Sequence, residues 1–487
     1  MIGAVCTVTP VLLTHLSASD LAAAIRRREV SAVEVVEAHI GVLERITDRN
    51  ALAADCFDAA REQARAADAR VAAGPADDLP PLLGVPATVK ELIATRGMPH
   101  SGGFPHRRRF RVAEDAPVVA RLRAAGVIVL GVGNTPGPFY WLETNNRIYG
   151  RTSNAYDPSR TAGGSSGGDA VMVGSGGAPI ALGSDMGGSI RVPAFVNGVF
   201  GHLPSPGLVP ITGHFPMPSG EIRRTLFIGP LARRAADLAP VLRIISGPDG
   251  EDPNTVAMPL GDPDTVSVSG LRVVVSRESS TLPLRPVIAR AVDDAAGMLE
   301  SAGAKVEDVS LRGLRWALAQ LSAIAWSEFD LLASWTTLTE PTRPSGRTRT
   351  PLRVAAPAAV LQAVESAPAQ FLRTRAARRL VDASRRAADS LIETIGDGVL
   401  LYPPFPRIAP KHRTTLGQPW LATNTAVFNM FGLPATQVPL GLTDDGLPRG
   451  VQVVSAPGQD HVSIAVALEL ERATGGWVDP RDVRRNG

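Results

Sequence analysis

The sequence predicts an α/β protein, and two observations carry this prediction. Short apolar runs rich in β-branched residues alternate along the chain with segments that have the periodicity of helices. This alternation is typical of a sheet that is covered by helices. Hydrophobic residues make up 44% and charged residues 20% of the 487-residue chain, so a large apolar core can form.

The expected helices and strands can be taken in chain order. Ser17 and Ser31 each precede apolar residues at helical spacing, so each is expected to begin a helix. The run from Leu83 to Lys90 is apolar and β-branched, which indicates a buried strand. Further helices are expected at 58–73, 115–126, 233–245, 286–302 and 461–472, further strands at 127–130, 271–276, 306–309 and 399–402, a proline- and glycine-rich loop at 195–226, and mostly helical structure at 315–380.

Composition argues against several kinds of partner. The formal net charge is only +3 and no basic stripe with interleaved aromatic residues is present, so no nucleic acid partner is expected. No run of 18 apolar residues without charge or proline occurs, so we expect no membrane-spanning helix. Cys6 and Cys56 have neither metal-binding nor redox spacing, and no metal or cofactor is expected. Two cysteines are too few to stabilise so long a chain by disulfides, which favours a reducing cytoplasm, and the N-terminus, which lacks a basic region and is interrupted by Pro10, argues against a signal peptide.

The most unusual stretch runs from Thr161 to Pro193, where glycines and serines surround an apolar segment. Glycine allows tight turns whose N–H groups point inward. Residues 170–182 are expected to form a helix, alone or followed by a strand, which would bring the two glycine clusters to one pocket. A flexible linker has no reason to carry such a segment, and a phosphate-binding loop needs a lysine that the stretch lacks.

Serine chemistry at this stretch would require a base. No histidine lies between His106 and His202, and arginine does not deprotonate in proteins. The chain has only three lysines, and Lys90 stands at the end of the expected buried strand. To act as a base near neutral pH, its pKa must fall by roughly three units, which burial can supply. The competing interpretation is a strand-end lysine that extends to solvent.

Three motifs resemble those of the amidase signature family of serine hydrolases. They are GVPATVKE around Lys90, GGSSGG at 163–168, and GSDMGGSIRVP at 183–193. The resemblance implies a Ser-cis-Ser-Lys triad, in which Ser189 is the acyl nucleophile, Ser165 is the bridging serine with a cis peptide, and Lys90 is the terminal base. It also implies a large, mixed and twisted sheet with helices on both faces.

The residues around Ser189 are expected to support this chemistry. Successive backbone N–H groups can form an oxyanion hole. The N–H groups expected to do so are those of Met186, Gly187, Gly188 and Ser189. Asp185 and Arg191 flank the nucleophile and are expected to pair and brace its turn, and Ser166 is expected to form a hydrogen bond that supports Ser165.

Three features concern the substrate. Phe139 stands where the family places a residue that lines the acyl-binding site. The run PAFVNGVFGHLPSPGLVPITGHFP resembles the fatty-acid amide hydrolase type 2 branch. Leu226 and Phe227 replace a polar pattern found in amidotransferase subunits and favour an apolar substrate, although both residues can also be simple core positions.

We expect a single domain over residues 1–487, because no internal repeat and no clear linker is present. The resemblance divides this domain into four parts. They are N-terminal helices at 15–75, a catalytic core at 85–245, a variable helical cap region at 310–390, and a C-terminal part of the core at 395–475.

The resemblance implies an amidase that cleaves carboxylic acid amides to an acid plus ammonia or an amine through a serine acyl-enzyme, with apolar or fatty acyl amides as the expected substrates. Two alternatives remain open. One is an amidotransferase-type subunit that releases ammonia to a partner enzyme, and the other is an esterase or aryl acylamidase. The sequence does not determine the acyl length, the leaving amine or the oligomeric state, for which a homodimer is one option.

Overall fold

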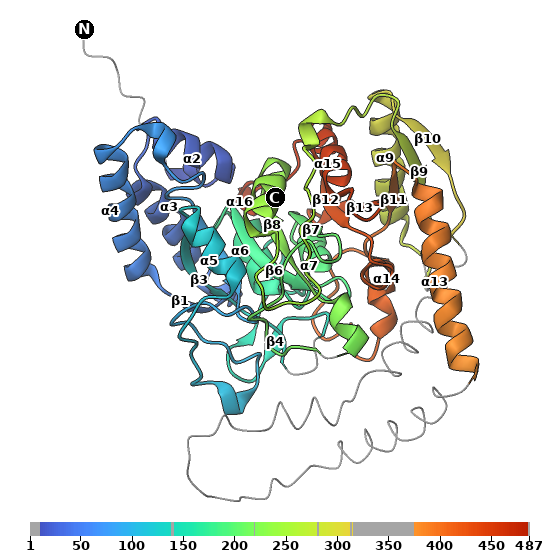
Figure 1. The fold of residues 1–487 in the computed structure, drawn as a ribbon, viewed down its shortest axis with the longest axis horizontal. Coiled ribbons are helices and arrows are strands. Elements are labelled where there is room, and N and C mark those ends of the chain that lie inside the picture. The colour runs from blue at the N-terminus through green and yellow to red at the C-terminus, as the bar shows by residue number, and fades with distance from the viewer. Residues whose placement is uncertain are drawn as a thin grey trace, which may run out of the picture.

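The computed structural model describes residues 10–137, 141–218, 220–279, 282–311, 314 and 375–485 of the chain (Figure 1). Its centre is an 11-stranded sheet with the order β1-β3-β2-β6-β8-β7-β12-β13-β11-β9-β10. The strands are β1 Leu52–Asp55, β2 Pro86–Lys90, β3 Ile128–Gly133, β6 Ile180–Asp185, β7 Phe200–Leu203, β8 Phe227–Ala232, β9 Arg272–Val275, β10 Lys305–Asp308, β11 Val399–Tyr402, β12 Ala435–Leu442 and β13 Pro448–Ser455; β4 Asn145–Asn146 and β5 Gly150–Arg151 form a separate pair.

The large sheet is mixed. β2 pairs in parallel with β3 and β6. From β6 through β8, β7, β12 and β13 to β11 all neighbours are antiparallel. β11, β9 and β10 are again parallel. The expected α/β class with a large mixed sheet is therefore confirmed, whereas the division of the chain into one domain with four parts stays a prediction.

Helices cover both faces of this sheet. They are α1 Pro10–Leu13, α2 Ala18–Arg26, α3 Ala32–Arg45, α4 Phe57–Ala73, α5 Pro117–Ala124, α6 Gly167–Gly174, α7 Arg191–Val196, α8 Leu238–Ile245, α9 Pro286–Ser301, α13 Arg375–Ile395, α14 Thr423–Phe431, α15 Asp460–Thr474 and α16 Pro480–Arg485. Successive strand residues point to opposite faces. In β11, Val399 and Leu401 belong to the core cluster that includes α9 and α15, whereas Leu400 and Tyr402 belong to the cluster that includes α13 and α14.

The first helices begin where the sequence indicates. The Ser17 side chain accepts a hydrogen bond from the backbone N–H of Asp20 at the start of α2. Ser31 and Glu34 form a capping box at the start of α3. Such caps satisfy backbone donors that have no partner within the helix. Both predicted helix starts are therefore confirmed.

The expectation of a continuous loop at 195–226 is wrong. The structure has α7 at its start, and Phe200–Leu203 forms strand β7 in the middle of the sheet. All four residues of β7 are buried, but glycine and histidine interrupt this short segment, so it lacks the β-branched apolar run that indicates a buried strand. Mostly helical structure was expected at 315–380. Residues 315–374 of this range lie outside the described part of the chain, and residues 375–380 belong to α13.

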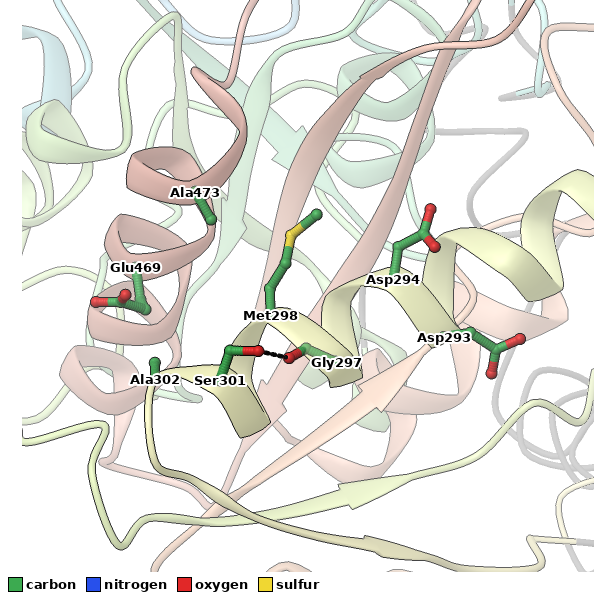
Figure 2. Close-up of a pocket in the computed structure, with 8 residues that line it drawn as sticks. All are labelled: Asp293, Asp294, Gly297, Met298, Ser301, Ala302, Glu469 and Ala473. Atoms are coloured by element: carbon green, nitrogen blue, oxygen red, sulfur yellow. Dashed lines mark hydrogen bonds between the residues drawn. The ribbon is translucent and has the colours of Figure 1, made fainter.

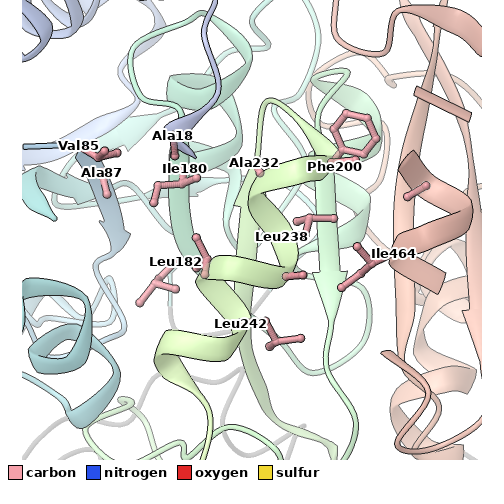
Figure 3. Packing of buried hydrophobic residues seen from close by; sticks show 14 of the residues in the cluster. Ala18, Val85, Ala87, Ile180, Leu182, Phe200, Ala232, Leu238, Leu242 and Ile464 are labelled. Carbon is pink, nitrogen blue, oxygen red and sulfur yellow. The ribbon is translucent and has the colours of Figure 1, made fainter. Parts of the chain in front are cut away.

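The core around β2 and β6 fixes the edge of the sheet where the conspicuous motifs meet. Ala87 lies opposite Ile180 and Val89 opposite Leu182, and these strands pack with α8 in one hydrophobic cluster (Figure 3). Because β2 and β6 are parallel, their carboxyl ends lie at the same edge. Lys90 ends β2 at this edge.

Candidate active site

Lys90 is buried at the carboxyl end of β2, with 0% of its surface exposed. Its Nζ lies 2.6 Å from Ser165 Oγ, 3.0 Å from Ser184 Oγ and 3.2 Å from the carbonyl oxygen of Ser184. These are the hydrogen-bond contacts of the amine within the described residues. The interpretation of Lys90 as a lysine that extends to solvent is therefore wrong, and its amine lies within hydrogen-bond distance of Ser165, whose catalytic role stays a prediction.

Ser165 occupies a tight glycine turn before α6. The Gly164–Ser165 peptide is cis, as the resemblance implies. Gly163 has a φ of +75°, and a Cβ at this position would lie 2.8 Å from the Cα of Pro193. Glycine is required there because both the backbone conformation and the contact with Pro193 exclude a side chain. This close approach seats the Ser165 turn directly against α7.

The turn that carries Ser189 connects β6 to α7 and is organised by Asp185. The Asp185 carboxylate accepts hydrogen bonds from the N–H of Gly188 at 2.5 Å and of Ile190 at 3.1 Å, and it pairs with Arg191 Nε at 3.1 Å. Both charged side chains are fully buried. Burial alone would raise the pKa of Asp185, but Arg191 and the other donors lower it to about 2. The predicted pair that braces the turn is confirmed.

The two serine-bearing turns lie against each other. The backbone N–H of Ser166 donates to the carbonyl oxygen of Ser189 at 3.1 Å. Ser165 is 2% exposed, whereas Ser189 is partly exposed. The Oγ atoms of these two serines are not hydrogen-bonded to each other in the described part of the chain. Ser165 thus lies on the buried side of the site and Ser189 on its open side.

Ser166 does not support Ser165 through its side chain, so that expectation is wrong. Its hydroxyl instead contacts the backbone of Ser184, 3.3 Å from the N–H and 3.3 Å from the carbonyl oxygen. Ser166 therefore joins the start of α6 to the end of β6. This contact holds the residue that also binds Lys90.

The four backbone N–H groups expected to form an oxyanion hole differ in their present partners. Those of Gly187 and Gly188 donate to Asp185 Oδ1, at 3.2 Å and 2.5 Å. Within the described residues, the N–H groups of Met186 and Ser189 have no protein partner. These two donors are therefore the ones available to a bound oxyanion.

The environment of Lys90 disfavours its charged form. Burial lowers the pKa of Lys90 from 10.5 to about 7, against the opposing influence of Asp169 and Asp185. Asp169, in the first turn of α6, is also fully buried, and burial raises its pKa. Its Oδ1 accepts a hydrogen bond from Thr88 Oγ1 at 3.2 Å. Desolvation thus acts on both members of this pair toward the uncharged state.

The sequence did not single out two polar residues next to Lys90. Ser184 Oγ lies 3.0 Å from Lys90 Nζ and 2.9 Å from Nε2 of His214. His214 is buried, and its Nδ1 lies 3.0 Å from the carbonyl oxygen of Pro216. Its position in a proline- and glycine-rich segment gave no signal, because that segment was expected to be a loop.

The residues expected to contact substrate are either outside the described part of the chain or buried in the core. Phe139 lies outside the described residues, as do most residues of the cap region at 310–390. Leu226 and Phe227 are each 6% exposed and belong to hydrophobic core clusters. The core alternative for this pair is therefore confirmed, and the pair does not support an apolar substrate.

The described residues contain neither a candidate metal site nor a candidate membrane-spanning helix. Among them, no group of three or more His, Cys, Asp or Glu side chains could hold a metal ion. In the same part of the chain, no helix is long and apolar enough to cross a membrane.

A groove of about 620 Å³ lies between α9 and α15, apart from the residues described above (Figure 2). It is lined by Asp293, Asp294, Gly297, Met298, Ser301, Ala302, Glu469 and Ala473. Its two aspartates pair with Arg277 and Arg449. None of the motif residues lines this groove, so it is not the candidate active site.

Comparison with known proteins agrees with the motifs and the fold. The Amidase family model matches residues 34–463. The chain is 38% identical to fatty-acid amide hydrolase 2-B of Danio rerio, covering 97% of this chain and 92% of the relative. It is 32% identical to a glutamyl-tRNA(Gln) amidotransferase subunit of Salinispora arenicola, covering 96% of this chain and 99% of that protein. The solved structure of 6-aminohexanoate cyclic dimer hydrolase is similar with a TM-score of 0.79 at 26% identity, covering 95% of this chain and 97% of that one.

These matches extend over nearly the whole chain and include the segments that carry all three motifs. The chain therefore belongs to the amidase signature family. It is an amide-hydrolysing enzyme.

Proposed function

We propose that the chain hydrolyses amides through an acyl-enzyme on Ser189, with Ser165 as the relay and Lys90 as the base. The observation that carries this proposal is the buried Lys90 amine 2.6 Å from Ser165 Oγ. Because burial lowers its pKa to about 7, a large fraction of this lysine is neutral at physiological pH. A neutral amine has the lone pair that a general base requires.

The proposed reaction has two halves. Lys90 accepts the Ser165 proton while Ser165 accepts the proton of Ser189, whose Oγ attacks the substrate carbonyl. The N–H groups of Met186 and Ser189 stabilise the oxyanion, and removal of one such donor costs roughly 3 kcal/mol of transition-state stabilisation. The proton returns through Ser165 to the leaving nitrogen, and the C–N bond breaks. Water then attacks the ester carbonyl and gives one proton through Ser165 to Lys90. The C–O bond to Ser189 breaks, the acid leaves, and the proton returns through Ser165 to Ser189 Oγ.

For this relay, the hydroxyl of Ser189 must come within hydrogen-bond reach of Ser165 when substrate binds. Ser189 is partly exposed, and the N–H groups of the residues before and after it, Gly188 and Ile190, both donate to the Asp185 carboxylate. Catalytic hydrogen bonds that are long in a free enzyme commonly tighten in the substrate complex. The geometry is compatible with the proposed order Lys90, Ser165, Ser189.

We further propose that the acyl group is apolar. The support is the 38% identity to fatty-acid amide hydrolase 2-B over 97% of the chain. Phe139 keeps its proposed place in the acyl-binding site. A cytoplasmic location and a homodimer also remain predictions.

A second candidate function has its own support. The 32% identity to an amidotransferase subunit over 96% of the chain favours a protein that releases ammonia to a partner enzyme. The two candidates differ in whether the isolated chain turns over simple amides. An esterase activity would use the same acyl-enzyme.

The test is turnover of p-nitroanilides and primary amides with acyl chains from acetyl to dodecanoyl. Ser189→Ala is expected to abolish turnover, and the thermal midpoint should stay unchanged because the Ser189 side chain is partly exposed. Turnover that rises with acyl length supports the apolar acyl site. Full activity in Ser189→Ala would overturn the proposed nucleophile, and a folded but inactive wild-type chain would favour the partner-dependent candidate.

A further inference from the structure

A buried histidine stands behind the proposed base. His214 lies in the segment 213–216, which packs beside 92–94, the residues that follow Lys90. Gly213 accepts a hydrogen bond from the N–H of Ala94, and the N–H of Phe215 donates to the carbonyl oxygen of Leu92. The loop that carries His214 is therefore attached to the strand end that carries Lys90.

The hydrogen bonds of His214 fix its tautomer. Nδ1 lies 3.0 Å from the carbonyl oxygen of Pro216, which can only accept, so Nδ1 carries a proton. Burial, the largest cause, lowers the pKa of His214 to about 3, so the ring is neutral. A neutral ring has one proton, which leaves Nε2 as an acceptor. Ser184 Oγ, 2.9 Å from Nε2, must then donate to it.

The three contacts of the Lys90 amine account for its hydrogens and its lone pair. A neutral amine has two N–H groups and one lone pair. The carbonyl oxygen of Ser184 has no hydrogen and takes one N–H, at 3.2 Å. Ser184 Oγ has already given its hydrogen to His214, so it takes the second N–H, at 3.0 Å. The lone pair is left for the remaining contact, Ser165 Oγ at 2.6 Å.

We infer that His214 is a positioning residue that, through Ser184, directs the lone pair of Lys90 toward Ser165. This inference rests on the proposed function, in which Lys90 is the base. Without an acceptor at position 214, the Ser184 hydroxyl is free to turn and donate to the Lys90 lone pair. The amine would then donate to Ser165 Oγ, which is the wrong direction for removing its proton.

The charged and titratable groups around this chain of contacts come from several elements. Asp169 faces Lys90 from α6, and Asp185 faces it from the end of β6. His100 faces His214 from the preceding loop. His100 is also buried, but its Nε2 contacts the carbonyl oxygen of Leu92 at 3.1 Å and not Ser184. It is therefore a matched control, a buried histidine that has no hydrogen bond to Ser184 or Lys90 within the described residues.

The experiment compares His214→Phe, which removes the acceptor, with His214→Gln, whose amide oxygen can accept the Ser184 proton. His100→Phe is the control. The readouts are kcat and KM on a p-nitroanilide that wild type cleaves, the rate at which a fluorophosphonate labels Ser189, and the thermal midpoint. General base catalysis contributes roughly 100- to 10,000-fold, so partial misdirection of the base should lower kcat about 10- to 100-fold in His214→Phe.

The expected pattern is specific. KM should change little, labelling should slow in parallel with kcat, and His214→Gln should recover most of the lost rate. His100→Phe should stay within about threefold of wild type. In a Ser184→Ala background the hydroxyl that can misdirect the amine is gone, so His214→Phe should cost less than about twofold there.

Two results would overturn the inference. One is a His214→Phe rate within about twofold of wild type, and the other is an equal loss in the Ser184→Ala background, which would indicate a purely structural role. If His214→Phe does not fold, His214→Leu replaces it as the acceptor-free variant. Lys90→Ala distinguishes the failure of the two proposals. If Lys90→Ala retains more than about a tenth of the wild-type activity, Lys90 is not the base, and the inference about His214 fails with it. If Lys90→Ala is inactive but His214→Phe has normal activity, only the inference about His214 fails.

Discussion

The burial of Lys90 predicts how the stability of the folded chain depends on pH, and this prediction can be tested without a substrate. In the unfolded chain Lys90 keeps its proton up to an ordinary pKa of 10.5, whereas burial lowers the pKa in the folded state to about 7. Between these two values, unfolding takes up one proton. The free energy of unfolding therefore rises with pH by about 1.4 kcal/mol per pH unit from this residue alone.

Lys90→Met removes the titrating group while keeping a side chain of similar length. From about pH 8 to about pH 9.5, wild type is therefore expected to gain about 2 kcal/mol of stability relative to Lys90→Met. The variant also loses the contacts of Lys90 with Ser165 and Ser184, but that loss does not vary with pH and cancels in the slope. Titrating groups that do not interact with Lys90 cancel in the same way because both proteins contain them. Asp169 does not cancel, because the charge of Lys90 lowers its pKa, so the comparison is repeated with Asp169→Asn in both proteins.

The assay is denaturation by guanidinium chloride at several pH values, followed by tryptophan fluorescence. Lys305→Met is the matched control, because Lys305 is exposed and should give no difference in slope. Equal slopes for wild type and Lys90→Met would contradict a lowered pKa of Lys90 in the folded state. They would mean that Lys90 stays protonated in the folded state, and a neutral base would then be absent.

Two further predictions concern the site. Asp185→Asn leaves the fully buried Arg191 without its counter-ion, so it should lower the free energy of unfolding by about 3 to 5 kcal/mol. The measurement is denaturation by guanidinium chloride, and a loss below about 1 kcal/mol would contradict the role of the Asp185–Arg191 pair in holding the turn. The kcat/KM of wild type should fall as pH drops below about 7, because protonated Lys90 has no lone pair, and a profile that stays flat down to about pH 5 would rule out this lysine as the base.

Local sequence patterns were sufficient for many elements of the fold. Ser17 and Ser31 begin α2 and α3 because capping depends on residues within one turn. The apolar run ending at Lys90 forms β2, and the segment at 170–182 contributes to α6 and β6. Strands β7 (FGHL) and β8 (FIGPLA) were missed because glycine, histidine and proline interrupt the β-branched apolar run by which a fully buried strand such as β2 is recognised.

The candidate site was predicted to the extent that its residues lie in continuous motifs. Lys90 meets Ser165, and Asp185 pairs with Arg191, as the motifs indicated. The positions of Leu226 and Phe227 could not be predicted in this way, because an apolar pair can line a pocket or fill a core. Only their burial in the assembled sheet distinguishes the two.

The α/β class, the glycine turns that hold the serines, and the lysine that can serve as a base could all be predicted from local sequence patterns. These properties depend on backbone conformation and side-chain chemistry over a few consecutive residues. In contrast, the donors that bind Asp185 and the contact of His214 with Ser184 behind Lys90 are visible only in the folded chain. Such contacts depend on strand register and on the packing of one loop against a distant strand end, and no local pattern in the chain encodes either of them.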